Sequence, residues 1–153
     1  MPAILFVCHG NICRSPMAEF ILKQEVQKAG LQNFHIESAA VSAEEIGNPV
    51  YPPARRKLAE HGIGCSGKRA RRMTPADYDR FDLLIGMDAS NLRGMKRICS
   101  GDPEHKIRSM MSFAGRDGDV ADPWYTGDFE AAWRDIAAGC RGLLNALSSA
   151  RPE

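Results

Sequence analysis

The sequence predicts an α/β fold in which helices cover both faces of a parallel sheet. Residues 3–7 (AILFV) form a short, continuous apolar run, which is the pattern of a strand buried on both faces. Further strand candidates follow at residues 34–40, 82–86 and 106–110, with helical segments between them. Because strands that alternate with helices pair in parallel, we expect a single α/β domain over residues 1–153.

The predicted helices are supported by their boundary residues and by one long apolar stripe. A helix is expected over residues 16–29, with Pro16 in its first turn and Gly30 as the stop signal after its last turn. A second helix follows the Pro- and Gly-rich loop 47–53 and ends at His61-Gly62, and a third is expected over residues 88–98. A long closing helix has apolar residues at three- and four-residue steps: Phe129, Trp133, Ile136, Cys140, Leu144 and Leu147.

The composition excludes several classes of protein. The chain has 153 residues and a net charge of +1, so it can bury a core and gives no reason to expect nucleic-acid binding. The basic runs 68–72 and 93–97 are interpreted as solvated faces. We expect neither a membrane span nor a signal peptide, because no sufficiently long apolar stretch occurs. The five cysteines lack disulfide-framework spacing, which indicates a cytoplasmic protein with reduced thiols. Cys65, Cys99 and Cys140 are interpreted as packing or bystander residues.

The candidate site is the loop that joins the first strand to the first helix, CHGNICRS. Backbone N–H groups in such a tight loop can point inward and bind an anion, and the N-terminus of the next helix adds positive potential. Arg14 supplies a planar guanidinium that can bind two phosphate oxygens. Cys8 is then expected to be a nucleophilic thiolate, and Ser15 to donate a hydrogen bond to its sulfur. The predicted nucleophile and phosphate clamp comprise Cys8, His9, Gly10, Asn11, Ile12, Cys13, Arg14 and Ser15.

The residues alone leave other interpretations of this loop open. A cysteine in an apolar context is usually a buried packing residue. Cys8, His9 and Cys13 could instead bind a metal, although no second ligand pair occurs at the usual spacing. The loop could also bind phosphate without catalysing a reaction. Its position between a buried strand and the start of a helix favours the catalytic interpretation.

The segment VCHGNICRSPMAEF (residues 7–20) resembles the signature of the low-molecular-weight protein tyrosine phosphatases. Further matches to this family lie in order along nearly the whole chain: Ser38-Ala39, Ile46-Gly47-Asn48-Pro49, His61-Gly62-Ile63, Ala70-Arg71, Met87-Asp88, Ser90-Asn91-Leu92 and Asp122-Pro123-Trp124-Tyr125. The resemblance implies a four-stranded parallel sheet in a flavodoxin-like, doubly wound arrangement. The site would lie at the carboxyl end of the first strand, where such sheets open their ligand crevice.

The same resemblance implies roles for the residues of the site. Cys8 would be the nucleophile that forms a cysteinyl-phosphate, and Arg14 would bind the phosphate. Asp122 would act first as the general acid and then as the general base, although Asp-Pro by itself is a common turn pair. The implied partners are phosphotyrosine-containing proteins and a cognate tyrosine kinase, and neither a metal nor a cofactor is expected.

Several positions depart from the family pattern: Lys68, the segment 50–53, Glu44, and His9, where an apolar residue is common. Lys68 stands where the family often has His, so the hydrogen bonds that support Asn11, Ser15 and Ser38 in the family do not carry over directly. Glu44 occupies a position on the wall of the substrate pocket that is commonly aromatic. Its carboxylate would either face the substrate phosphate or point to solvent. In the second case the wall would come from Tyr51, Trp124 or Tyr125.

Three rival functions share this fold or border it. Arsenate reductases resemble the family but need resolving cysteines, and Cys65 and Cys99 do not form a convincing pair. Phosphoarginine phosphatases carry Thr where this chain has Ile12, and the apolar Ile12 favours phosphotyrosine. A catalytically silent phosphate-binding adaptor is disfavoured because all three catalytic candidates are present. The sequence therefore predicts a protein tyrosine phosphatase.

Overall fold

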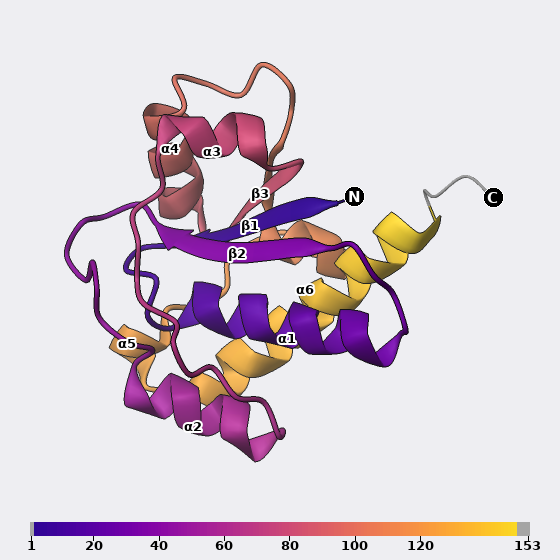
Figure 1. Cartoon of the computed structure of the whole chain (residues 1–153). Coiled ribbons are helices and arrows are strands. Elements are labelled where there is room, and N and C mark those ends of the chain that lie inside the picture. Colours follow the sequence, from indigo (N-terminus) through magenta and orange to yellow (C-terminus); the bar gives the residue numbers. More distant parts are fainter. Residues whose placement is uncertain (1, 150–153) are drawn as a thin grey trace.

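The computed structural model describes residues 2–149, and four strands form one parallel sheet in the order β2-β1-β3-β4 (Figure 1). The strands are β1 (Ala3–Cys8), β2 (His35–Ala40), β3 (Leu83–Gly86) and β4 (Ile107–Ser109). Val7 of the central strand is level with Ala39 on one side and Gly86 on the other, so three strands end at the same edge of the sheet. The predicted four-stranded, doubly wound parallel fold is confirmed.

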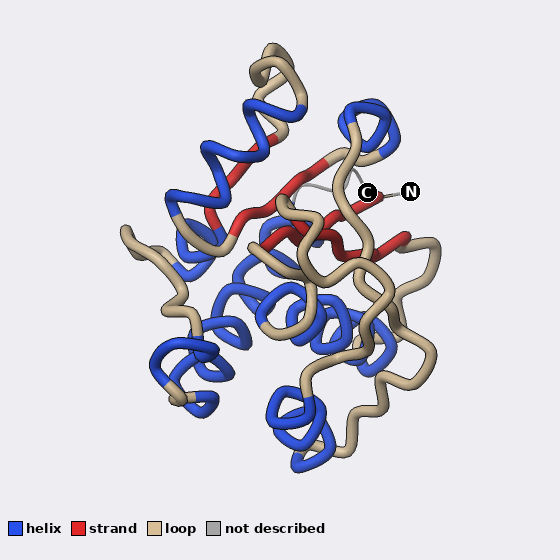
Figure 2. The backbone as a smooth tube through the Cα atoms, turned by 90° about the vertical axis from the view of Figure 1, so that its left-hand side faces the viewer, coloured by secondary structure: helices blue, strands red, loops and turns tan. Residues whose placement is uncertain are grey.

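Helices cover both faces of the sheet, as Figures 1 and 2 show. On one face lie α1, α2 and α6, and on the other lie α3 and α4. The helices are α1 (Arg14–Lys28), α2 (Pro52–Glu60), α3 (Pro75–Arg80), α4 (Ala89–Ile98), α5 (Pro123–Thr126) and α6 (Phe129–Ser149). The short helix α5 and the loop between β2 and α2 lie at the carboxyl edge of the sheet. In the described residues, no helix is both long and apolar enough to cross a membrane.

The core is divided in two by the sheet, because successive side chains of a strand point to opposite faces. Ile4, Phe6 and Cys8 of β1 pack into the core formed with α1, α2 and α6. Leu5 and Val7 pack into the second core, under α3 and α4. Cys8, the last residue of β1, is therefore placed where the larger core meets the carboxyl edge of the sheet.

The apolar stripe of the predicted closing helix is confirmed, and α6 packs against α1 and against a 3₁₀ helix (Met110–Ala114). A Cβ on Gly142 would lie 1.7 Å from the carbonyl oxygen of Phe113, so this close approach requires glycine. Cys65 and Cys140 are buried in the larger core, as expected for packing residues.

Some predicted boundaries were wrong, and three short helices were missed. The first helix begins at Arg14 instead of residue 16, so Arg14 and Ser15 belong to its first turn. The fourth strand is shorter than predicted because the 3₁₀ helix begins at Met110. The missed elements are this 3₁₀ helix, α3 and α5, all of which are too short to show an apolar period.

Candidate active site

The loop between β1 and α1 surrounds the sulfur of Cys8 with hydrogen-bond donors. The hydroxyl oxygen of Ser15 lies 3.0 Å from Cys8 Sγ, and the backbone N–H of Ser15 donates to Sγ over 3.4 Å. Asn11 has a positive φ of 61°, a left-handed conformation that Asn tolerates better than most residues and that helps to bend the loop. The sulfur of Cys8 thus lies within hydrogen-bond distance of two groups of Ser15.

Arg14 is buried beneath the same loop, and two carboxylates hold its guanidinium. Nη1 donates to Asp88 Oδ2 at 2.7 Å and to the carbonyl oxygen of Val120 at 2.9 Å, and Nη2 donates to Asp122 Oδ2 at 3.2 Å. Burial lowers the pKa of Arg14, but the sulfur of Cys8 and the two carboxylates outweigh it, and the pKa is raised above its ordinary value. Nε–H and the second Nη2–H share the remaining edge of the planar group, which suits an oxyanion.

Asp122 is held in two ways at the start of α5. It is the N-cap of this helix, where Oδ1 accepts a hydrogen bond from the backbone N–H of Trp124 at 3.1 Å. Its other oxygen, Oδ2, is the one that contacts Arg14. The carboxylate therefore lies between the guanidinium and the exposed aromatic residues of α5.

These side chains open into a pocket of about 100 Å³. Its lining consists of Cys8, His9, Gly10, Ile12, Cys13, Arg14, Glu44, Glu45, Asp122, Trp124 and Tyr125. All the residues predicted for the site line this pocket except Asn11 and Ser15, which lie behind its wall and are buried. Glu44 lines the pocket and also accepts a hydrogen bond from His9 Nε2 at 3.0 Å. In the described part of the chain, no group of three or more His, Cys, Asp or Glu residues is arranged to hold a metal ion.

Asn11 and Ser15 support the loop from behind. The side-chain amide of Asn11 donates to Ser15 Oγ at 2.8 Å and to Ser38 Oγ at 2.9 Å, while its oxygen accepts from the backbone N–H of Arg71. Because Ser15 Oγ accepts from Asn11, its own hydrogen is free to donate to Cys8 Sγ. These contacts indicate that the hydroxyl of Ser15 is the donor and the sulfur of Cys8 the acceptor.

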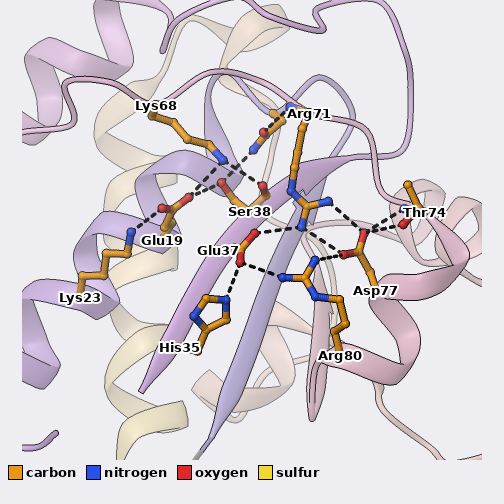
Figure 3. Close-up of polar contacts among 11 residues, drawn as sticks. Glu19, Lys23, His35, Glu37, Ser38, Lys68, Arg71, Thr74, Asp77 and Arg80 are labelled. Carbon is orange, nitrogen blue, oxygen red and sulfur yellow. Dashed lines mark hydrogen bonds and ion pairs between the residues drawn. The ribbon is translucent and has the colours of Figure 1, made fainter. Parts of the chain in front are cut away.

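The support continues into a buried ionic network around Glu19 and Lys68 (Figure 3). Ser38 Oγ donates to Glu19 Oε1 at 2.6 Å, and Lys68 Nζ donates to the carbonyl oxygen of Ser38 at 2.9 Å. Lys68 also pairs with Glu19 at 3.3 Å, and Lys23 pairs with the other oxygen of Glu19 at 2.6 Å. Burial lowers the pKa of Lys68, and the nearby Glu19 opposes that shift. The hydrogen bonds of Asn11, Ser15 and Ser38 thus form with Lys68 in place of His.

The segment that carries Lys68 is fixed to the sheet by a second group of ions, also visible in Figure 3. Arg71 donates from Nη1 and Nη2 to the two oxygens of Asp77, at 3.0 and 3.1 Å, and from Nη2 to Glu37 at 3.1 Å. The backbone N–H of Arg71 donates to Asn11 Oδ1, so these ion pairs also help to position the loop that holds Cys8.

Sequence reasoning missed Asp88, Glu19 and Glu45 as residues of the site. Asp88 had a usable signal, because it lies two residues after the end of β3 and forms a capping box with Asn91 at the start of α4. Glu19 and Glu45 had no comparable signal, since charged residues on a helix or in a loop are usually solvated.

Comparison with known proteins gives a consistent answer. The chain matches the family of low molecular weight phosphotyrosine protein phosphatases over residues 3–152. It is 37% identical over 150 residues to the low molecular weight protein-tyrosine-phosphatase YfkJ of Bacillus subtilis, and this match covers 96% of each chain. The crystal structure of YfkJ has a TM-score of 0.95 at 35% identity, covering 99% of this chain and 98% of that one.

Two further similar proteins also match over nearly the whole length of both chains. A low molecular weight protein-tyrosine-phosphatase of Streptomyces coelicolor is 36% identical over 152 residues, covering 94% of this chain and 92% of the relative. The crystal structure of a Drosophila arginine phosphatase has a TM-score of 0.89 at 33% identity, covering 97% of this chain and 99% of that one. The chain belongs to the low molecular weight protein-tyrosine-phosphatase family and is an enzyme of this class.

Proposed function

We propose that the protein hydrolyses phosphotyrosine in proteins through a cysteinyl-phosphate on Cys8. The observation that carries the proposal is the convergence of Cys8, Arg14 and Asp122 on one small pocket. A nucleophile, a cationic phosphate clamp and a proton donor are the three groups that this reaction needs. The family membership supports the same reaction.

In the first step the phosphoryl group lies against the loop, with two of its oxygens on the open edge of Arg14. Its negative charge attracts the guanidinium and weakens the contact between Nη2 and Asp122, so Oδ2 of Asp122 can turn to the leaving oxygen. The negative phosphate also favours the protonated form of this carboxyl group. Cys8 Sγ attacks phosphorus as the bond to the tyrosine oxygen breaks, and Asp122 gives its proton to that oxygen.

In the second step Asp122, now a carboxylate, accepts a proton from water as the water attacks phosphorus. The bond between sulfur and phosphorus breaks, and the electron pair returns to Cys8. The hydroxyl and backbone N–H of Ser15 stabilise the sulfur anion as it leaves. Phosphate is then released and the thiolate is ready for another turnover.

Replacing the nucleophile tests this mechanism. Cys8→Ser substitutes a hydroxyl that remains protonated near neutral pH. We expect turnover of an aryl phosphate to be abolished while the variant still binds phosphate or vanadate. Rapid acid quench of the wild type with labelled substrate should trap phosphate on Cys8. Substantial activity in Cys8→Ser, together with no trapped intermediate in the wild type, would contradict the proposal.

Phosphoarginine is the alternative substrate that the comparisons bring forward, because one similar structure is that of a Drosophila arginine phosphatase. The apolar side chain of Ile12 lines the pocket and matches a tyrosine ring better than a guanidinium. We expect kcat/KM to be higher for a phosphotyrosine peptide than for a matched phosphoarginine peptide. The opposite order would assign the enzyme to phosphoarginine.

A further inference from the structure

The mouth of the active-site pocket has two chemically different sides. On one side Glu44 and Glu45 of the loop between β2 and α2 line the pocket, and on the other Trp124 and Tyr125 of α5 do so. Among the described lining residues, the basic side chains are His9 and Arg14, and Arg14 is buried at the base and paired with two carboxylates. The rim is therefore acidic, although the pocket binds an anion at its base.

The acidic side of the rim is rigidly attached to the catalytic loop. The backbone N–H and the hydroxyl of Ser42 both donate to the carbonyl oxygen of His9, at 3.1 and 2.9 Å. Glu45 packs against Gly10, where an added Cβ would lie 3.2 Å from Glu45 Cγ, and its Oε1 accepts from Asn48 at 2.9 Å. These contacts hold the carboxylates at a set position beside the opening.

Among the described residues, neither rim carboxylate forms an ion pair with Lys or Arg. Glu45 accepts a hydrogen bond from the neutral side-chain amide of Asn48. Glu44 accepts from His9 Nε2, which can donate in a neutral tautomer, and the Glu44 side chain is 67% exposed. A charged group of a bound peptide can therefore approach Glu44 directly from solvent.

The rim also carries apolar surface suited to a peptide. The large hydrophobic residues that the structure records as exposed are Ile46 (57%), Trp124 (52%) and Tyr125 (81%). Trp124 and Tyr125 line the pocket, and Ile46 follows Glu45 in the acidic loop. Exposed apolar side chains gathered around one opening are typical of a binding surface.

We propose that Glu44 and Glu45 make the enzyme select phosphotyrosines that have Lys or Arg beside them in the sequence. The inference rests on the proposed function, since a phosphotyrosine that fills the pocket places its neighbours in the peptide at the rim. At about 6 Å in water, one favourable charge contact raises kcat/KM about threefold, and a like charge lowers it by the same factor. A Lys-flanked substrate should thus exceed a Glu-flanked one by about tenfold per contact at low salt.

Three phosphotyrosine peptides that differ only in the flanking residues (Lys, Gln or Glu) test the proposal. For the wild type at low ionic strength we expect kcat/KM in the order Lys, Gln, Glu, with the spread reduced at high salt. In the double variant Glu44→Gln, Glu45→Gln the three values should converge. Glu104→Gln is the matched control, because Glu104 is an exposed carboxylate that precedes β4 at the opposite edge of the sheet. It should retain the wild-type order.

The outcomes separate the two proposals. Equal values for all three peptides in the wild type, or a preference for Glu, would overturn the selectivity and leave the phosphatase mechanism intact. A Lys preference that survives in the double variant would show that other residues cause it, which also overturns the assignment. Failure to hydrolyse any of the peptides would overturn the proposed function and this inference with it.

Discussion

Asp122 gives the sharpest test of the mechanism, because its two oxygens have separable tasks. Oδ1 caps α5 through the backbone N–H of Trp124, and Oδ2 contacts Arg14 at 3.2 Å beside the pocket. Asp122→Ala removes both contacts. Asp122→Asn keeps an oxygen for the cap but has no proton of suitable acidity to give to a leaving group. The pair of variants therefore separates the structural contribution from the chemical one.

The expected size of the effect follows from these contacts. Loss of general-acid assistance is worth about 10²–10⁴-fold in kcat, or about 2.7–5.4 kcal/mol of transition-state stabilisation. Loss of an N-cap costs about 0.5–2 kcal/mol of stability, and the low end applies to a helix as short as α5. Both variants should lose the same large factor in kcat on phosphotyrosine and both lose the ion pair with Arg14. Asp122→Ala, which also loses the cap, should unfold at a lower urea concentration than Asp122→Asn.

The assay compares a phosphotyrosine peptide with p-nitrophenyl phosphate. The nitrophenolate leaves without a proton, so kcat on this substrate should fall much less in both variants. Binding of vanadate should be kept or improved, since the negative charge of Asp122 no longer lies beside the bound anion. If both substrates lost the same factor in Asp122→Asn, the carboxylate would be a structural residue and the assignment of the general acid would be refuted.

Two further predictions concern the residues around the loop. Burial and, to a smaller extent, the nearby Cys8 raise the pKa of Cys13, so Cys13 stays a thiol while Cys8 is oxidised first. Peroxide should then convert the pair into a Cys8–Cys13 disulfide, and a thiol reductant should restore the activity of the wild type. Equal recovery in Cys13→Ser would exclude this protective role. Lys68→Met removes the ion pair with Glu19 and the donor to the carbonyl oxygen of Ser38, which should cost about 1–3 kcal/mol in urea unfolding. Glu19 keeps its contacts with Lys23 and with the hydroxyl of Ser38. Adding Glu19→Gln should recover part of this loss, whereas strictly additive losses would show that the pair does not interact.

The part of the site that could be predicted is local in sequence. The proposed nucleophile, the bend and the proposed phosphate-binding arginine lie within one loop that follows a buried strand, so the apolar run and the residue types in one short segment are enough to predict them. The carboxylates that complete the site are 74 and 108 residues away from Arg14, at Asp88 and Asp122. Asp122 was accessible only through the family resemblance, because its Asp-Pro pair is equally typical of a turn.

The distant residues meet at the site because of the order of the strands. Since β3 pairs with β1, Asp88 emerges from the sheet beside the loop that holds Cys8. No periodicity in the sequence determines which strands become neighbours, so the contact between Asp88 and Arg14 follows only from the assembled sheet. The short helix α3 also depends on a contact that periodicity does not predict. Its capping box joins Thr74 and Asp77, and Asp77 in addition binds Arg71 from outside the helix.

The network behind the loop shows how Lys68 can support the residues around Cys8 without a histidine at that position. Lys68 and His differ in shape and charge, yet the lysine chain is long enough to reach the carbonyl of Ser38 and the carboxylate of Glu19. Glu19 then accepts from the hydroxyl of Ser38, which leaves that hydroxyl oxygen free to accept from Asn11. The orientation of Asn11, and through Ser15 that of the donor at Cys8, is therefore reached with Lys at position 68 and does not require an imidazole there.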